Sequence, residues 1–261
     1  MTDTAQRRWA ETLRKPGNGF LWPAAGAGWH ARFHTPGREV GLSGHTALAC
    51  AHVALAGASR VTLRSRTDEL VIAREANELW LTLPRPRLEA FAAPLLRIAK
   101  AFGMTADMFD QGDAVVKTGD GDLLLPLSVH VDPLALTPDS AALSAIGSEL
   151  GTRGFCVFTQ RTNHPESHLQ SRFFAPHIGV KEDIATGSVH GPLAVRLWEL
   201  GRIRAQGPTL RLTGEQGDAL GRPCRVRIEL TIDDGALVKV RVGGSVVTIE
   251  ERAVSPGELE A

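Results

Sequence analysis

Two short polar segments of the sequence combine a glycine with side chains that can bind an anion or transfer a proton. Ser43-Gly44-His45-Thr46 and Thr186-Gly187-Ser188 each precede an apolar stretch rich in small residues. The first turn of a helix presents backbone N–H groups without intrahelical partners and about half a positive charge, so it binds carboxylates and oxyanions. We therefore expect each segment to begin a helix and to bind a small anionic substrate. The alternative is that Ser43 and Thr186 only cap their helices.

His45 is the acid–base candidate of the first segment, because an imidazole titrates near neutral pH. Asp183 precedes the second helix start, where it could orient His45 or exchange a proton with it if the two segments meet. Ser188 and His190 fall in the first turn of the second helix, where we expect them to contact substrate. The structural alternatives are a surface histidine and an acidic loop that favours the helix dipole.

A self-similarity indicates which elements position these residues. Arg32-Phe33-His34-Thr35-Pro36 recurs as Arg172-Phe173-Phe174-Ala175-Pro176, about 140 residues later. Each copy ends a predicted strand and is followed by a loop, a glycine and a small-residue helix. We therefore predict two equivalent lobes with strands around one helix, residues 1–135 with a helix at about 46–56 and residues 136–261 with a helix at about 186–200. C-terminal residues could cross back to the first lobe.

The remaining hydrophobic pattern predicts further helices and strands around this repeat. Helical signals cover residues 4–15, 88–102 and 137–150, the last with Asp139 or Ser140 as a cap. Alternating apolar residues predict strands through most of the rest, including a final strand at 245–249.

Composition excludes several classes of partner. The chain has 261 residues with 29 Lys+Arg and 29 Asp+Glu, whereas a nucleic-acid binder normally carries a basic excess. No apolar stretch is long enough to span a membrane. The three cysteines are too few and too scattered for a disulfide framework, which favours a reduced, cytoplasmic setting. We expect no metal site, because Pro165 interrupts the segment between His164 and His168, and no phosphate-binding cofactor loop is present.

The two helix starts resemble the signatures of a known family. Residues 44–53, Gly-His-Thr-Ala-Leu-Ala-Cys-Ala-His-Val, resemble the GHPTLGTAHV segment of the phenazine-biosynthesis (PhzF-like) isomerase family. Residues 174–176 and 182–190 resemble its FAP…EDPVTGSAH signature. The resemblance implies an α+β fold like that of diaminopimelate epimerase, with two pseudo-symmetric lobes, each a mixed β-barrel around a central helix. It also implies an active site between the lobes, a homodimer, and no metal or organic cofactor.

Site residues follow from the same resemblance, position by position. The catalytic histidine, aspartate and serine of the family fall on His45, Asp183 and Ser188. Residues expected to bind substrate are Gly44, Thr46, Thr186, Gly187, His190 and Asn18.

The sequence departs from the family pattern in two places. It has no counterpart of the family's opening strand with its GNP-type motif. The family's principal base is a glutamate in an S-E-T-x-F-V segment, and Gly17 takes that place here, within residues 16–21. Glu11 lies too far upstream to replace it.

These observations predict a cofactor-independent isomerase that moves a proton, with a double-bond shift, on a small carboxylated, unsaturated or amino-acid-derived metabolite of a secondary-metabolite pathway. One alternative is an epimerase or racemase, which needs two bases on opposite faces of a carbon. Paired thiols usually supply these bases in that fold, whereas Cys50 and Cys156 do not lie at the helix starts. The other alternative is a non-catalytic metabolite-binding protein that has lost the glutamate.

Overall fold

The computed structural model describes residues 1–15 and 17–255, which form two compact units. Of the described residues, those in the ranges 1–82 and 243–255 form the first unit, and those in the range 83–242 form the second. This division differs from the expected boundary at 135/136. The reason is strand pairing: β9 (Asp122–Pro126) runs parallel to β10 (Gly154–Thr159) and hydrogen-bonds to it, so residues before 135 complete the second unit's sheet.

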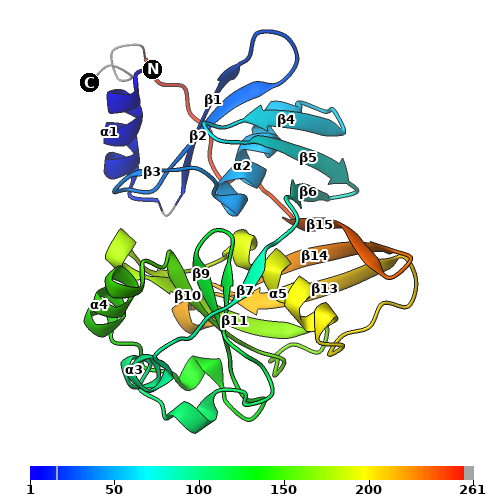
Figure 1. The fold of residues 1–261 in the computed structure, drawn as a ribbon. Helices are drawn as coiled ribbons and strands as arrows, with labels where there is room; N and C mark the ends of the chain where they lie inside the picture. Colours follow the sequence, from blue (N-terminus) through cyan, green and yellow to red (C-terminus); the bar gives the residue numbers. More distant parts are fainter. Residues whose placement is uncertain (16, 256–261) are drawn as a thin grey trace. The chain divides into compact units, whose positions relative to one another are not determined.

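The first unit is a sheet packed on one central helix (Figure 1). Its strands follow the order β1-β2-β4-β5-β6, and a short β3 pairs with β2. The helix α2 packs against β1, β2 and β4, and its fully buried Ala47 and Ala51 let the strands approach closely. The elements are α1 (Asp3–Leu13), β1 (Asn18–Pro23), β2 (Trp29–His34), β3 (Glu39–Val40), α2 (Gly44–Leu55), β4 (Arg60–Arg64), β5 (Glu69–Glu75) and β6 (Glu78–Leu83).

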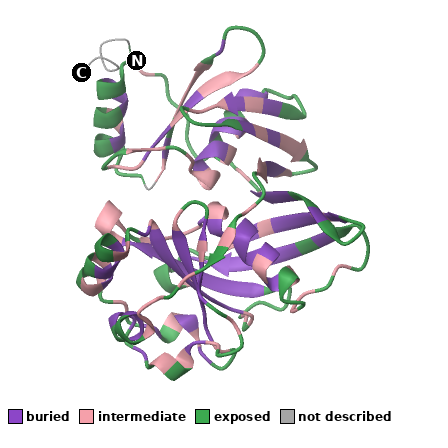
Figure 2. Ribbon diagram, viewed as in Figure 1, coloured by how far each residue is buried: buried purple, intermediate pink, exposed green. Residues whose placement is uncertain are grey.

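The second unit has a larger sheet in the order β15-β14-β13-β11-β10-β9-β8-β7, with β12 paired to β11. Its central helix α5 is largely buried, whereas α3 and α4 keep exposed faces (Figure 2). The helices are α3 (Leu95–Ala101), α4 (Ser140–Leu150) and α5 (Gly187–Glu199). The other strands are β7 (Leu88–Ala90), β8 (Val116–Thr118), β11 (Leu169–Ala175), β12 (Val180–Asp183), β13 (Thr209–Gln216), β14 (Cys224–Asp233) and β15 (Ala236–Gly244). Single 3₁₀ turns are η1 (Ala106–Met108), η2 (Pro133–Ala135), η3 (Pro176–Ile178) and η4 (Asp218–Leu220).

Two predicted elements are wrong. The expected helix over 88–102 is a strand, β7, followed by the shorter helix α3, because Pro94 is the residue at which the helix begins. Residues 245–249 form no strand in the described chain, and Ile249 is 95% exposed, so the alternating pattern there has no sheet to complete. No described helix is long and apolar enough to cross a membrane.

The repeated five-residue motif produces the same local structure twice. In each copy a strand pairs antiparallel with a short strand, and the central helix follows: β2–β3–α2 and β11–β12–α5. The arginine of each copy forms an ion pair with a glutamate of the short strand, Arg32 with Glu39 and Arg172 with Glu182, both at 2.8 Å. The repeat is therefore structural, and it positions both helix starts.

Candidate active site

The first turn of α2 carries the site residues of the first unit. Ser43 precedes the helix with extended backbone, but its side chain caps no N–H group among the described residues. Its hydroxyl instead lies 2.8 Å from the Thr46 hydroxyl. Thr46 is buried, whereas Gly44 and His45 are partly exposed. The first-turn N–H groups are therefore not covered by a cap side chain.

Gly17 lies against the imidazole of His45. A Cβ atom added at residue 17 would stand 2.1 Å from Thr46 Oγ1 and 2.6 Å from His45 Nε2, far inside van der Waals contact. The structure thus brings the position that the resemblance assigns to a glutamate beside the expected catalytic histidine, and the imidazole occupies the space next to it. Pro16, which precedes it in the aligned segment, lies outside the described residues.

Asn18 does not face an open surface, as a substrate-binding residue would. It is 6% exposed, and its amide nitrogen donates to the backbone carbonyl oxygens of Lys15 (3.1 Å) and His34 (3.3 Å). The amide nitrogen of Asn18 therefore holds the start of β1 against β2, and substrate binding by this residue stays a prediction.

The start of α5 carries the site residues of the second unit. Thr186 precedes the helix, and its side chain caps no N–H group in the part of the chain described. Its hydroxyl donates instead to Asp183 Oδ2 at 2.7 Å. Asp183, Gly187 and Ser188 are partly exposed. The predicted aspartate, threonine, glycine and serine of the second segment therefore do lie together.

Two other helices of the same chain, α1 and α4, are capped in the usual way, whereas α3 begins after Pro94 without a side-chain cap in the described chain. Thr2 accepts a hydrogen bond from the N–H of Ala5 in α1, and Asp139 accepts two from the first turn of α4. At α2 and α5, the hydroxyls of Ser43 and Thr186 bond to the side chains of Thr46 and Asp183 and not to backbone N–H groups. The simple capping alternative therefore does not describe Ser43 and Thr186 in the described part of the chain, and the positive end of each helix dipole lies at a start without a side-chain cap.

His190 is fully buried and cannot touch a ligand in this conformation, contrary to the prediction. Its Nδ1 lies 2.9 Å from the carbonyl oxygen of Thr186 and therefore donates to it, and its Nε2 lies 3.5 Å from the Ser171 hydroxyl. Burial lowers the pKa of His190 to about 4, so the ring is neutral. His190 supports the helix start from inside the unit.

Arg153 is a site residue that sequence reasoning missed. Its Nη2 donates to the Ser188 hydroxyl at 2.9 Å, and the same nitrogen together with Nε binds the fully buried carboxylate of Asp122. The Arg153 side chain is 30% exposed. Because the serine oxygen accepts this bond, its own proton can be donated to a ligand. No local pattern marks Arg153, since it lies 35 residues before Ser188.

Gln216 is the second residue that the sequence did not indicate. It lies at the end of β13, is 1% exposed, and hydrogen-bonds to both Asp183 and Thr186. Its only sequence signal is the Gln216-Gly217 pair that ends a predicted strand region.

Two of the three thiols, those of Cys50 and Cys156, are buried where they cannot act as acid or base. Cys50 lies inside α2, and burial raises its pKa to about 12. Cys156 lies inside β10 and is fully buried, which raises its pKa as well. Neither sulfur is at a helix start, so a two-thiol epimerase mechanism has no support. Among the described residues, no group of three or more His, Cys, Asp and Glu side chains could hold a metal ion.

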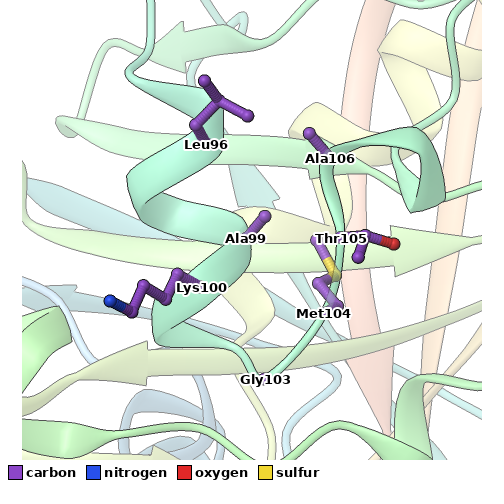
Figure 3. Close-up of a pocket in the computed structure, with 7 residues that line it drawn as sticks. All are labelled: Leu96, Ala99, Lys100, Gly103, Met104, Thr105 and Ala106. Carbon is purple, nitrogen blue, oxygen red and sulfur yellow. The ribbon is translucent and has the colours of Figure 1, made fainter.

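A separate pocket of about 410 Å³ lies in the second unit, between α3 and η1 (Figure 3). Its lining is mostly apolar, and Lys100 supplies its one charged group. None of the lining residues belongs to the two helix starts, and one ammonium group among apolar side chains offers no acid–base pair. The lining residues are Leu96, Ala99, Lys100, Gly103, Met104, Thr105 and Ala106.

Comparison with known proteins agrees with this architecture. Residues 1–252 match the phenazine biosynthesis-like protein family, PhzC-PhzF. The uncharacterized isomerase YddE of Salmonella typhimurium is 30% identical over 95% of this chain and 87% of its own length. A solved PhzF-family protein from Bacillus anthracis superposes with a TM-score of 0.83 at 19% identity, over 94% of this chain and 86% of that one. A predicted epimerase from Pseudomonas aeruginosa, 28% identical, covers the same shares with a TM-score of 0.72.

Proposed function

Because the chain belongs to the phenazine biosynthesis-like protein family, whose relatives are named isomerases, we propose that it moves a proton on a small carboxylated metabolite, unsaturated or derived from an amino acid. In this proposal His45 is the acid–base group, in place of the family's glutamate. The supporting observation is the position of Gly17, whose missing side chain leaves the adjoining space to the His45 imidazole.

The second helix start supplies the other roles. Asp183 takes part in proton transfer, and the Ser188 hydroxyl, held by Arg153, donates a hydrogen bond to the substrate. The N–H groups at Gly44 and Gly187 bind the carboxylate and stabilise the negative charge that develops when a proton leaves the adjacent carbon. General acid–base assistance contributes about 10²–10⁴-fold, so positioning supplies the rest of the acceleration. A homodimer in the cytoplasm, acting in a secondary-metabolite pathway, belongs to the same proposal.

Deuterium incorporation from D₂O into a mixture of candidate substrates tests this function. The enzyme is incubated in D₂O with the small-molecule fraction of a bacterial extract, and mass spectrometry follows deuterium gain and the interconversion of isomers. We expect the wild-type protein to label or interconvert a carboxylate, and His45→Ala and Asp183→Asn to lower that rate at least about 100-fold. His52→Ala, on the same helix, is the matched control and retains activity. If the wild-type protein changes no carboxylate, the proposal is wrong and the non-catalytic binding alternative gains support. If the wild type is active and the His45 and Asp183 variants are equally active, the proposed roles of these two residues are wrong.

A further inference from the structure

Gln216 joins the loop that carries Asp183 to the start of α5. We propose that Gln216 is a positioning residue: it fixes the direction of the Thr186–Asp183 hydrogen bond and so selects the Asp183 oxygen that transfers the proton. This inference rests on the proposed function, in which Asp183 takes part in proton transfer. It adds a residue that touches neither the substrate nor the reacting proton.

The backbone partners of Gln216 determine which end of its amide is oxygen. Its Nε2 lies 2.7 Å from the carbonyl oxygen of Asp183, which can only accept a hydrogen bond. Its Oε1 lies 3.2 Å from the backbone nitrogen of Thr186, which can only donate. Exchanging the two ends would break both bonds, so the orientation of the amide is unambiguous.

The second hydrogen of Nε2 then sets the role of the Thr186 hydroxyl. Nε2 donates to Thr186 Oγ1 at 3.0 Å, so that oxygen acts as an acceptor toward Gln216. Its own proton is directed to Asp183 Oδ2 at 2.7 Å. Gln216 therefore donates to Thr186, and Thr186 donates to Asp183. Asp183 Oδ2 is held as an acceptor, which assigns proton transfer to Oδ1.

The position of Gln216 is itself fixed by the fold. Its side chain is almost fully buried, where an amide group without hydrogen-bond partners destabilises the folded protein. The turn after it requires Gly217, which has φ +88°, and a Cβ there would stand 2.8 Å from the carbonyl oxygen of Ile184. The end of β13 thus approaches the Asp183–Thr186 loop too closely for any residue other than glycine at position 217. The backbone of Gln216 is therefore held in a fixed position beside the loop.

The hydroxyl proton of Thr186 gives a readout that needs no substrate. We expect a slowly exchanging Thr186 hydroxyl resonance in the NMR spectrum of the wild-type protein, and exchange with solvent at least tenfold faster in Gln216→Met. Gln170→Met is the matched control, since Gln170 is also 1% exposed and donates its amide to Glu215 at 3.3 Å. Equal exchange rates in wild type and Gln216→Met would overturn the inference.

A second measurement separates hydrogen bonding from packing. Gln216→Glu keeps the shape of the side chain but loses both N–H donors. We expect Gln216→Glu and Gln216→Met to lower the deuterium-labelling rate in the bacterial extract about tenfold or more, and Gln170→Met to leave it within about twofold of wild type. A Gln216→Glu rate equal to wild type refutes positioning by donation. The NMR experiment uses no substrate, so it tests the hydrogen bonding of Gln216 independently of the proposed function. It remains decisive even if Asp183→Asn shows that the proposed function is wrong.

Discussion

His190 makes the stability of the protein depend on pH in a way that can be worked out from its surroundings. The ring is fully buried and donates from Nδ1 to the Thr186 carbonyl oxygen, and burial lowers its pKa to about 4. In the unfolded chain the same group has a pKa near 6.5. At a pH between these two pKa values, His190 binds a proton in the unfolded state but not in the folded state. The free energy of unfolding is therefore unaffected by His190 above about pH 7, and it falls as the pH drops from 6.5 towards 4.

The size of the loss follows from the two pKa values. The difference of about 2.5 units corresponds to roughly 3 kcal/mol at pH 4, and to about 2 kcal/mol at pH 5. A typical domain is stable by only about 5–15 kcal/mol, so a loss of this size is a substantial fraction of the free energy of unfolding. His190→Asn keeps a donor near the position of Nδ1 but removes the titration.

Urea denaturation at a series of pH values measures the effect. We expect the free energy of unfolding of the wild-type protein to fall by about 3 kcal/mol more than that of His190→Asn between pH 7 and pH 4. Above pH 7 the two curves should run parallel, separated only by the packing cost of the substitution. Curves that stay parallel down to pH 4 would refute the argument that burial keeps His190 neutral.

Three further predictions concern Gly17, Arg153 and Cys50. Gly17→Ala places a Cβ atom 2.1 Å from Thr46 Oγ1, so we expect it to destabilise the protein by about 1–3 kcal/mol in urea denaturation; a neutral effect would contradict the close approach. Arg153→Met leaves the buried Asp122 carboxylate without its cation, so we expect it to lower the free energy of unfolding by about 3–5 kcal/mol. The double variant Arg153→Met/Asp122→Leu should recover most of this loss. An equal loss in the single and double variants would argue against the ion pair. With its pKa raised to about 12, Cys50 is a thiolate in only about 1 in 10⁴ molecules at pH 8. Iodoacetamide should therefore modify Cys50 only after unfolding, and rapid modification of the native protein would show that the thiol is accessible.

Local pattern was enough to predict both helix starts and the repeated strand–loop–helix order. Glycine and small residues after a polar cap position favour a helix start wherever they occur, and the structure begins α2 at Gly44 and α5 at Gly187. The family signatures lie on these same segments, so the candidate residues of each unit were found together. Where local signals conflict, as at Pro94 within an apolar periodic stretch, the pattern gave one long helix and the structure has a strand and a short helix.

Periodicity alone could not decide how the chain divides. The β8 and β9 strands belong to the second unit because they pair with β10, directly for β9 and through β9 for β8, and pairing partners are not encoded in the spacing of one strand. The same limit applies to Asn18, which the family resemblance placed in the site, and to His190, which the helix start placed there. Their polar side chains turn inward because each finds backbone partners there.

Sequence by itself determined the two helix starts and the residue types they present, because helix initiation depends on neighbours within one turn. Only the tertiary structure decided what surrounds them. Arg153 reaches Ser188 across 35 residues, and Gln216 reaches Thr186 across 30. Both contacts exist because strand register brings distant segments together, and a buried polar group must take whichever partner that register supplies.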